Sequence, residues 1–133
     1  MEMKIDFPGG KKVYSTYKGF TIQTDQAKEE GGDGSAPEPY DVFLSSIGTC
    51  AGVYVLYFCQ ERNIDPSGIR MRLQFDRNED KNLTEAIRIH IDLPPSFPPK
   101  YERAVIKTAG LCTVKRNILN PPEFKISAEI REN

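Results

Sequence analysis

Three cysteines are the residues in this chain of 133 residues whose type and spacing suggest chemistry: Cys50, Cys59 and Cys112. The first two lie in an uncharged run, residues 42–59, which predicts a helix. Nine residues along a helix separate two side chains by about 13 Å, on roughly opposite faces. A disulfide needs Cα atoms within about 7 Å of each other. Any redox pair within one chain therefore includes Cys112.

Cys50 is the better partner for Cys112, because small residues surround it and leave room for another backbone or a substrate. Cys59 lies among bulky neighbours and has the character of a small apolar filler. Cys112 precedes Lys115 and Arg116, and positive charge near a helix start favours a thiolate. The alternative is that all three are core cysteines, since free cysteine is often buried.

Composition argues against several other functions. The net charge of -1 and the absence of a basic block argue against nucleic-acid binding. One histidine and no Cys-x-x-Cys argue against a metal site, and no cofactor is expected. Residues 1–6 lack the apolar core of a signal peptide, so we expect a cytoplasmic protein.

The elements that must position the cysteines begin with a long central helix over residues 39–63. Prolines and acidic residues at its start suit a helix N-terminus, and residues 65–68 end it. The uncharged run reaches the lower length limit of a membrane span. Its serines and glycines, and flanks without clustered positive charge, favour a buried helix and no membrane.

The rest of the chain predicts a single α+β domain over residues 1–133, with antiparallel sheets around two main helices. Residues 25–37 predict a mobile polar loop, either a linker or a lid. His90 falls on the polar face of its strand, which favours a solvated histidine over a catalytic one. A second helix follows residues 94–99 and is capped by Gly110. The expected strands are residues 11–16, 20–24, 69–75, 86–93 and a closing strand, 124–130.

Two segments resemble a known family. Residues 39–50, PYDVFLSSIGTC, resemble the central-helix motif of the OsmC-like proteins: a proline, small and apolar residues, then the first cysteine. Residues 110–115, GLCTVK, resemble the segment that carries their second cysteine. The order of strands and helices agrees over nearly the whole chain.

The resemblance implies an intertwined homodimer, with two long central helices covered by sheets and two sites at the interface. It also implies thiol-dependent reduction of an organic hydroperoxide, or reaction with another small electrophile, in the response to oxidative stress. Cys50 would attack the peroxide and become a sulfenic acid. Cys112 would resolve it as a disulfide, which a cellular dithiol would reopen.

The chain also departs from the family pattern. Tyr40 stands where the hydroperoxide-reducing branches have a glutamate. Those branches also have an arginine in the N-terminal region that activates the first cysteine, whereas the first arginine of this chain is Arg62. Thr113 replaces the usual proline after the second cysteine. Asp41 is typical of the YhfA-like branch, to which the chain is closer.

We therefore expect Cys50 and Cys112 to be catalytic, with Tyr40, Asp41 and Phe43 binding the substrate. The rival hypothesis is a non-enzymatic protein that binds a small apolar ligand in the interface cleft, between walls that include Tyr40, Phe43 and Tyr54. A scaffold that has lost its chemistry is a third alternative.

Overall fold

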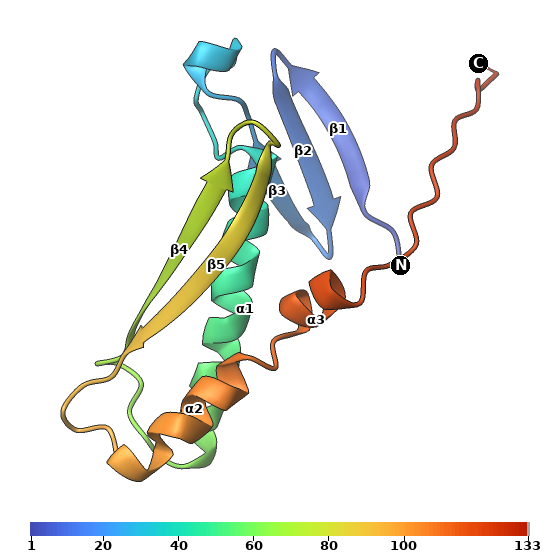
Figure 1. The fold of residues 1–133 in the computed structure, drawn as a ribbon. Coiled ribbons are helices and arrows are strands. Elements are labelled where there is room, and N and C mark those ends of the chain that lie inside the picture. Colours follow the sequence, from blue (N-terminus) through green and yellow to red (C-terminus); the bar gives the residue numbers. More distant parts are fainter. Residues whose placement is uncertain (133) are drawn as a thin grey trace. The chain divides into compact units, whose positions relative to one another are not determined.

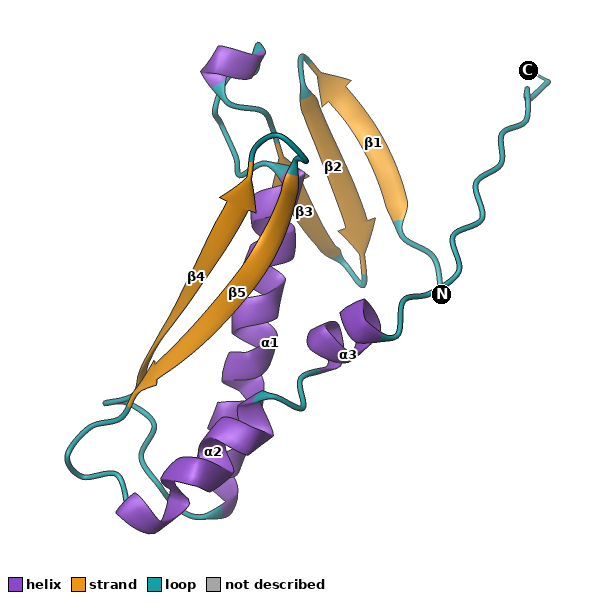
Figure 2. Cartoon of the chain, in the orientation of Figure 1, coloured by secondary structure: helices purple, strands orange, loops and turns teal. Residues whose placement is uncertain are grey.

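The computed structural model describes residues 1–132 and divides the chain into two compact units, Met1–Ser46 and Ile47–Asn133 (Figure 1). The expected α+β class is confirmed (Figure 2). A single domain remains a prediction. The elements in chain order are β1 (Lys4–Gly9), β2 (Lys12–Tyr17), β3 (Phe20–Thr24), a 3-10 turn η1 (Lys28–Glu30), α1 (Pro39–Glu61), β4 (Arg70–Asn78), β5 (Leu83–Asp92), a 3-10 turn η2 (Pro99–Tyr101), α2 (Glu102–Ala109) and α3 (Thr113–Leu119).

The first unit contains an antiparallel meander in the order β1-β2-β3, and the expected strands at residues 11–16 and 20–24 correspond to β2 and β3. Tyr17 pairs with Phe20, and the two residues between them, Lys18 and Gly19, have φ angles of 51° and 80°. Two positive φ angles are typical of the tight hairpin turn whose twist matches that of the strands. Glycine suits the second position because it adopts positive φ without steric cost.

A loop held around one carboxylate connects β3 to α1. Asp25 is buried, and its carboxylate accepts hydrogen bonds from the Ser35 hydroxyl at 2.6 Å and from the backbone amides of Gln26, Asp33 and Ser35. The Ser35 bonds are the largest cause that lowers the pKa of Asp25 from 3.8 to about 2. The Asp25 amide also donates to the Pro37 carbonyl, which brings the two ends of the loop together.

The second unit packs the β4–β5 hairpin against α1. Two glycines of α1 face the hairpin: a Cβ added at Gly48 would lie 3.6 Å from Leu73, and one at Gly52 would lie 3.8 Å from the Met71 sulfur. Both distances are ordinary van der Waals contacts, so this face of α1 lies directly against β4. The buried cluster joins α1 to α2 and consists of Val55, Phe58, Cys59, Phe97, Val105 and Ala109.

The C-terminal segment corrects one prediction, because residues 124–130 do not form a strand. Phe124, Ile126 and Ile130 are 81%, 96% and 100% exposed. Their alternation fits a strand with one buried face, but a strand also needs a neighbour for its backbone hydrogen bonds. Neither sheet in the described residues includes this segment. The sequence also predicts a short apolar and basic turn over residues 113–118, where the structure has the short helix α3 (Thr113–Leu119).

Candidate thiol site

Cys50 lies in the middle of α1, in the second unit. Its side chain is partly exposed, and the thiol is free. Within residues 1–132 its sulfur makes no hydrogen bond. In the turns of α1 around Cys50, the small residues Gly48 and Gly52 face β4 of the hairpin. Cys50 therefore lies on the side of α1 that faces away from the hairpin.

Cys112 occupies the N-cap position of α3, immediately after the chain leaves α2 at Gly110. The cap sulfur accepts a hydrogen bond from the Lys115 backbone amide at 3.3 Å, in the place where serine or threonine oxygen usually serves. The residue is 1% exposed. The local fold thus holds the Cys112 sulfur in one orientation.

A side-chain contact connects the two cysteine-bearing segments. The hydroxyl oxygens of Tyr54 and Thr113 lie 3.0 Å apart. Tyr54 follows Cys50 by one helical turn and shares its face of α1, since residues four apart are neighbours on a helix. Thr113 directly follows Cys112. The start of α3 is therefore tied to the face of α1 that carries Cys50, while all three cysteines are free thiols.

Cys59 lies in a different environment. It is fully buried in the cluster between α1 and α2, and burial raises the pKa of its thiol, an effect that the nearby Arg62 partly offsets. The Arg62 guanidinium stacks 3.7 Å from the ring centroid of Phe58 and donates to the Phe58 carbonyl. The first arginine of the chain thus stabilises the end of α1 near Cys59.

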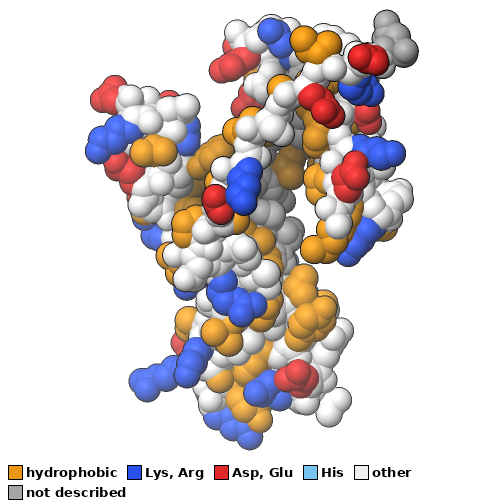
Figure 3. Space-filling model, turned by 90° about the vertical axis from the view of Figure 1, so that its right-hand side faces the viewer, with side chains coloured by type: hydrophobic (Ala, Val, Ile, Leu, Met, Phe, Trp, Pro, Cys, Tyr) orange, Lys and Arg blue, Asp and Glu red, His pale blue; other side chains and the backbone are white. Residues whose placement is uncertain are grey.

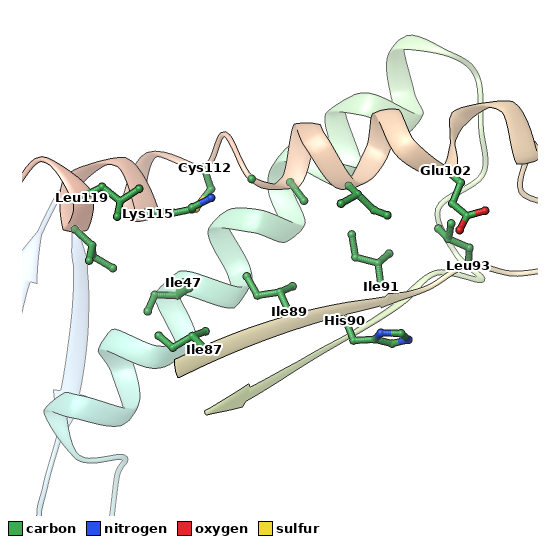
Figure 4. A pocket seen from close by; sticks show the side chains of 14 residues that line it. Ile47, Ile87, Ile89, His90, Ile91, Leu93, Glu102, Cys112, Lys115 and Leu119 are labelled. Atoms are coloured by element: carbon green, nitrogen blue, oxygen red, sulfur yellow. The ribbon is translucent and has the colours of Figure 1, made fainter. Parts of the chain in front are cut away.

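A pocket of about 580 Å³ opens beside Cys112, within the second unit (Figure 4). The isoleucines of β5 point into it, and His90 of the same strand is also a lining residue, although its ring points away from them. Lys115 and Glu102 supply its charged groups. Cys50 is not among its lining residues. The apolar lining consists of Ile47, Ile87, Ile89, Ile91, Leu93, Ile106, Ala109, Ile118 and Leu119.

Sequence reasoning did not find this pocket. The alternation of β5 predicts that its isoleucines face inward, but only the placement of α2 and α3 opposite them creates a cavity. The one available signal was the spacing of Cys112 and Lys115, which lie three residues apart. Among residues 1–132, no group of three His, Cys, Asp or Glu side chains is placed to hold a metal ion.

The expected substrate-binding residues lie at the start of α1, in the first unit. The rings of Tyr40 and Phe43 pack against each other with centroids 5.5 Å apart. The Asp41 carboxylate accepts a hydrogen bond from the Glu38 backbone amide at 3.2 Å, as in a capping box. Asp41 therefore has a structural role in starting the helix. A substrate-binding role for these three residues stays a prediction.

Helix α1 is the one helix of the described residues that is long and apolar enough to cross a membrane, with a mean hydropathy of 1.7 over its best window. The central helix of a soluble domain has the same length and composition. Of this window, 33% is buried inside the structure, and Gly48 and Gly52 of the helix face β4.

Comparison with known proteins identifies the family. The model of the OsmC-like protein family matches residues 32–127, well over half of the chain. The chain belongs to the OsmC-like proteins. A search of curated protein sequences finds no match. The expected OsmC-like fold is confirmed by solved structures that share it at low sequence identity, and these support the fold alone.

Three such structures show the range of OsmC-like relatives. A Psychrobacter arcticus protein, described as an osmotic stress induced and detoxification response protein, is 20% identical with a TM-score of 0.75, covering 86% of this chain and 85% of that one. An OsmC like protein from Mycoplasma pneumoniae is 13% identical with a TM-score of 0.70, covering 90% and 87%. The organic hydroperoxide resistance protein OsmC of Legionella pneumophila is 17% identical with a TM-score of 0.55, covering 89% of each chain.

Proposed function

We propose that this OsmC-like protein reduces organic hydroperoxides through the thiols of Cys50 and Cys112. The contact between Tyr54 and Thr113 carries the proposal, because it ties the Cys112 segment to the face of α1 that presents Cys50. Family membership supports it, since structural neighbours include proteins named for organic hydroperoxide resistance.

In this reaction, one thiolate attacks the peroxide and the second closes a disulfide, so that the hydroperoxide leaves as an alcohol and water. A cellular dithiol then returns the pair to thiols. We place the protein in the cytoplasm, where such dithiols keep thiols reduced. We also assign the protein to the YhfA-like branch, because Asp41 resembles the residue typical of that branch.

The test is a titration of the reduced protein with cumene hydroperoxide, followed by peptide mass spectrometry. We expect one disulfide between Cys50 and Cys112 for each hydroperoxide consumed. The matched control is Cys59→Ser, which should form the same disulfide because Cys59 lies in the core between α1 and α2. The proposal is wrong if the hydroperoxide leaves both thiols reduced.

We further propose a homodimer in which a second copy packs along α1. Val53 and Tyr57 are 40% and 56% exposed and follow Cys50 at helical spacing, so the three side chains form an apolar stripe. Hydrophobic side chains also reach the surface elsewhere, as Figure 3 shows. Apolar surface of this kind is typical of association sites. A partner helix at the stripe would bring Cys50 to the interface.

Sedimentation velocity tests this dimer. Val53→Glu would bury a charge in the interface and should convert the protein to a monomer. Gln60→Glu places the same charge on an exposed position of the same helix and should leave the dimer intact. A wild-type monomer at micromolar concentration, or a Val53→Glu dimer, would contradict the proposed packing.

The pocket beside Cys112 favours a second candidate function, the storage or transport of a small apolar ligand. Its volume of about 580 Å³ lies within the usual range of ligand sites, and its wall is mostly aliphatic. Binding of a fluorescent apolar probe such as 1-anilinonaphthalene-8-sulfonate, measured in reduced protein, distinguishes the two functions. Binding unchanged in Cys50→Ser and Cys112→Ser, together with no hydroperoxide consumption in the wild type, would favour this second candidate.

A further inference from the structure

A short chain of hydrogen bonds joins the start of α3 to α1. The Arg116 guanidinium donates to the Thr113 hydroxyl at 3.4 Å, and the hydroxyl oxygens of Thr113 and Tyr54 lie 3.0 Å apart. The Asn117 side-chain amide also donates to the Thr113 carbonyl at 2.9 Å. Residues of α3 therefore hold both the side chain and the backbone of Thr113 while its hydroxyl contacts Tyr54 of α1.

The residues of this contact are close to both thiols. Thr113 directly follows Cys112, and Tyr54 lies one helical turn after Cys50. Long side chains on a helix lean toward its N-terminus, over the residue four positions earlier. The Tyr54 side chain thus lies over the turn of α1 that contains Cys50. Its contact with Thr113 holds the Cys112 segment against that turn.

The two thiols differ in their access to solvent. Cys50 is partly exposed, whereas Cys112 is 1% exposed and its sulfur accepts a hydrogen bond from the Lys115 amide. Of the two, Cys50 is thus the thiol open to a hydroperoxide from solution. A buried thiol reacts only with a group that the fold brings to it, so the reaction of Cys112 depends on how its segment is held.

We propose that Tyr54 and Thr113 are positioning residues for the closing of the disulfide between Cys50 and Cys112. This inference rests on the proposed reduction of hydroperoxides. The hydroxyl contact limits the motion of the Cys112 segment relative to Cys50. It therefore raises the effective concentration of the second thiol at the first, and it takes no part in the attack on the peroxide.

The step that the contact assists follows the oxidation of Cys50. The Cys50 thiolate attacks the terminal oxygen of R–O–OH, so that an S–O bond forms, the O–O bond breaks, and the alkoxide takes a proton and leaves as an alcohol. The Cys112 thiolate then attacks the sulfenic acid sulfur. The S–S bond forms, the S–O bond breaks, and the hydroxide takes a proton and leaves as water. Cys112 is oxidised in this step, and Cys50 is reduced by the same amount.

Slow closing has a product of its own. A second hydroperoxide then oxidises the Cys50 sulfenic acid to a sulfinic acid and is itself reduced to an alcohol. The yield of Cys50 sulfinic acid at excess hydroperoxide therefore reports how fast Cys112 closes the disulfide.

Single-turnover kinetics separate the two steps. Reduced Tyr54→Phe and Thr113→Val are mixed with cumene hydroperoxide and quenched with acid at intervals, and peptide mass spectrometry follows the oxidation of Cys50 and the disulfide. We expect both variants to oxidise Cys50 at the wild-type rate but to close the disulfide about fivefold more slowly, with more sulfinic acid on Cys50. The double variant should close no more slowly than either single variant, because each change alone breaks the contact.

Two controls separate positioning from folding. Thr113→Ser keeps the hydroxyl and should close the disulfide at the wild-type rate. In Tyr101→Phe both steps should be unchanged, because the Tyr101 ring packs on Phe58 and its hydroxyl makes no hydrogen bond within residues 1–132. Closing at the wild-type rate in Tyr54→Phe and Thr113→Val would overturn the positioning role and leave the proposed function standing. A wild type that consumes no hydroperoxide would overturn both.

Discussion

The loop of residues 25–37 and the C-terminal segment of residues 121–132 both lack strands and α-helices, yet they differ in how they are held. The loop is polar, and a buried carboxylate binds three of its amides and a hydroxyl. The C-terminal segment carries apolar side chains at alternate positions and leaves them exposed. Short-range hydrogen bonds suffice to order a polar loop, whereas an alternating apolar segment needs a surface supplied from elsewhere.

The largest expected effect comes from breaking the loop at Gly32. A Cβ added there would lie 2.1 Å from the Gln26 carbonyl oxygen, and a backbone atom cannot rotate away. Gly32→Ala should therefore lower the free energy of unfolding by more than about 3 kcal/mol in a urea titration. Gly34→Ala is the control, because its Cβ has ordinary space and only the φ of 62° costs about 1 kcal/mol. Equal losses in both variants would show that the close contact is not decisive.

The next effect separates charge from shape within the loop. Asp25→Asn keeps the volume but removes the charge that four donors stabilise. Because the folded-state pKa is about 2, below 3.8, this contribution is present above pH 4 and is lost as the pH falls from about 4 to about 2. The wild type should melt at a higher temperature than Asp25→Asn at pH 7, and the two melting temperatures should converge near pH 2. The control Asp33→Asn should melt close to the wild type at pH 7, since its carboxylate is exposed. Parallel pH profiles of wild type and Asp25→Asn would contradict this account.

The C-terminal segment should respond in the opposite way. Truncation after Asn120 removes no residue of the buried cluster, so the unfolding free energy of a diluted monomer should change by less than about 0.5 kcal/mol. If a second copy supplies the missing surface, the same truncation should weaken the dimer by at least about tenfold in sedimentation equilibrium. If the truncated chain dimerises as tightly as the full chain, the exposed isoleucines have no role in association.

The smallest effect is expected at the surface of the loop. Lys12 and Asp33 form an ion pair, and the Asp33 side chain is 70% exposed. Exposed pairs contribute little to stability. Lys12→Gln should change the melting temperature by less than about 2 °C, well below the effect of Asp25→Asn at pH 7. A larger change would show that the exposed ion pair between Lys12 and Asp33, more than the Asp25 carboxylate, holds the loop.

Much of the fold follows from patterns that need no distant partner. The uncharged run predicts α1, and the alternating residues of β4 and β5 predict a hairpin with one face toward the helix. The C-terminal segment has the same alternation as β5, but neither sheet of the described residues pairs with it, so the pattern alone misassigns it. Helix α3 has only seven residues, so its helical period is too short to recognise.

The candidate site was predictable to a smaller extent. The spacing of Cys50 and Cys59 excludes a disulfide between these two residues of one helix, because helix geometry is local. Cys112 is left as the possible partner. The pocket depends on how β5 faces α2 and α3, which the sequence does not encode at any fixed spacing. Asp25 resembles any polar residue of a glycine-rich loop, and its burial follows only from the closure of that loop.

The buried thiol of Cys59 can serve as a probe of how often the core opens. Its thiol is fully covered by the packing between α1 and α2, and its raised pKa keeps it in the less reactive protonated form. A reagent such as iodoacetamide can label it only when that packing opens. The rate of labelling at Cys59 therefore reports how often the core opens, in native buffer and without added denaturant.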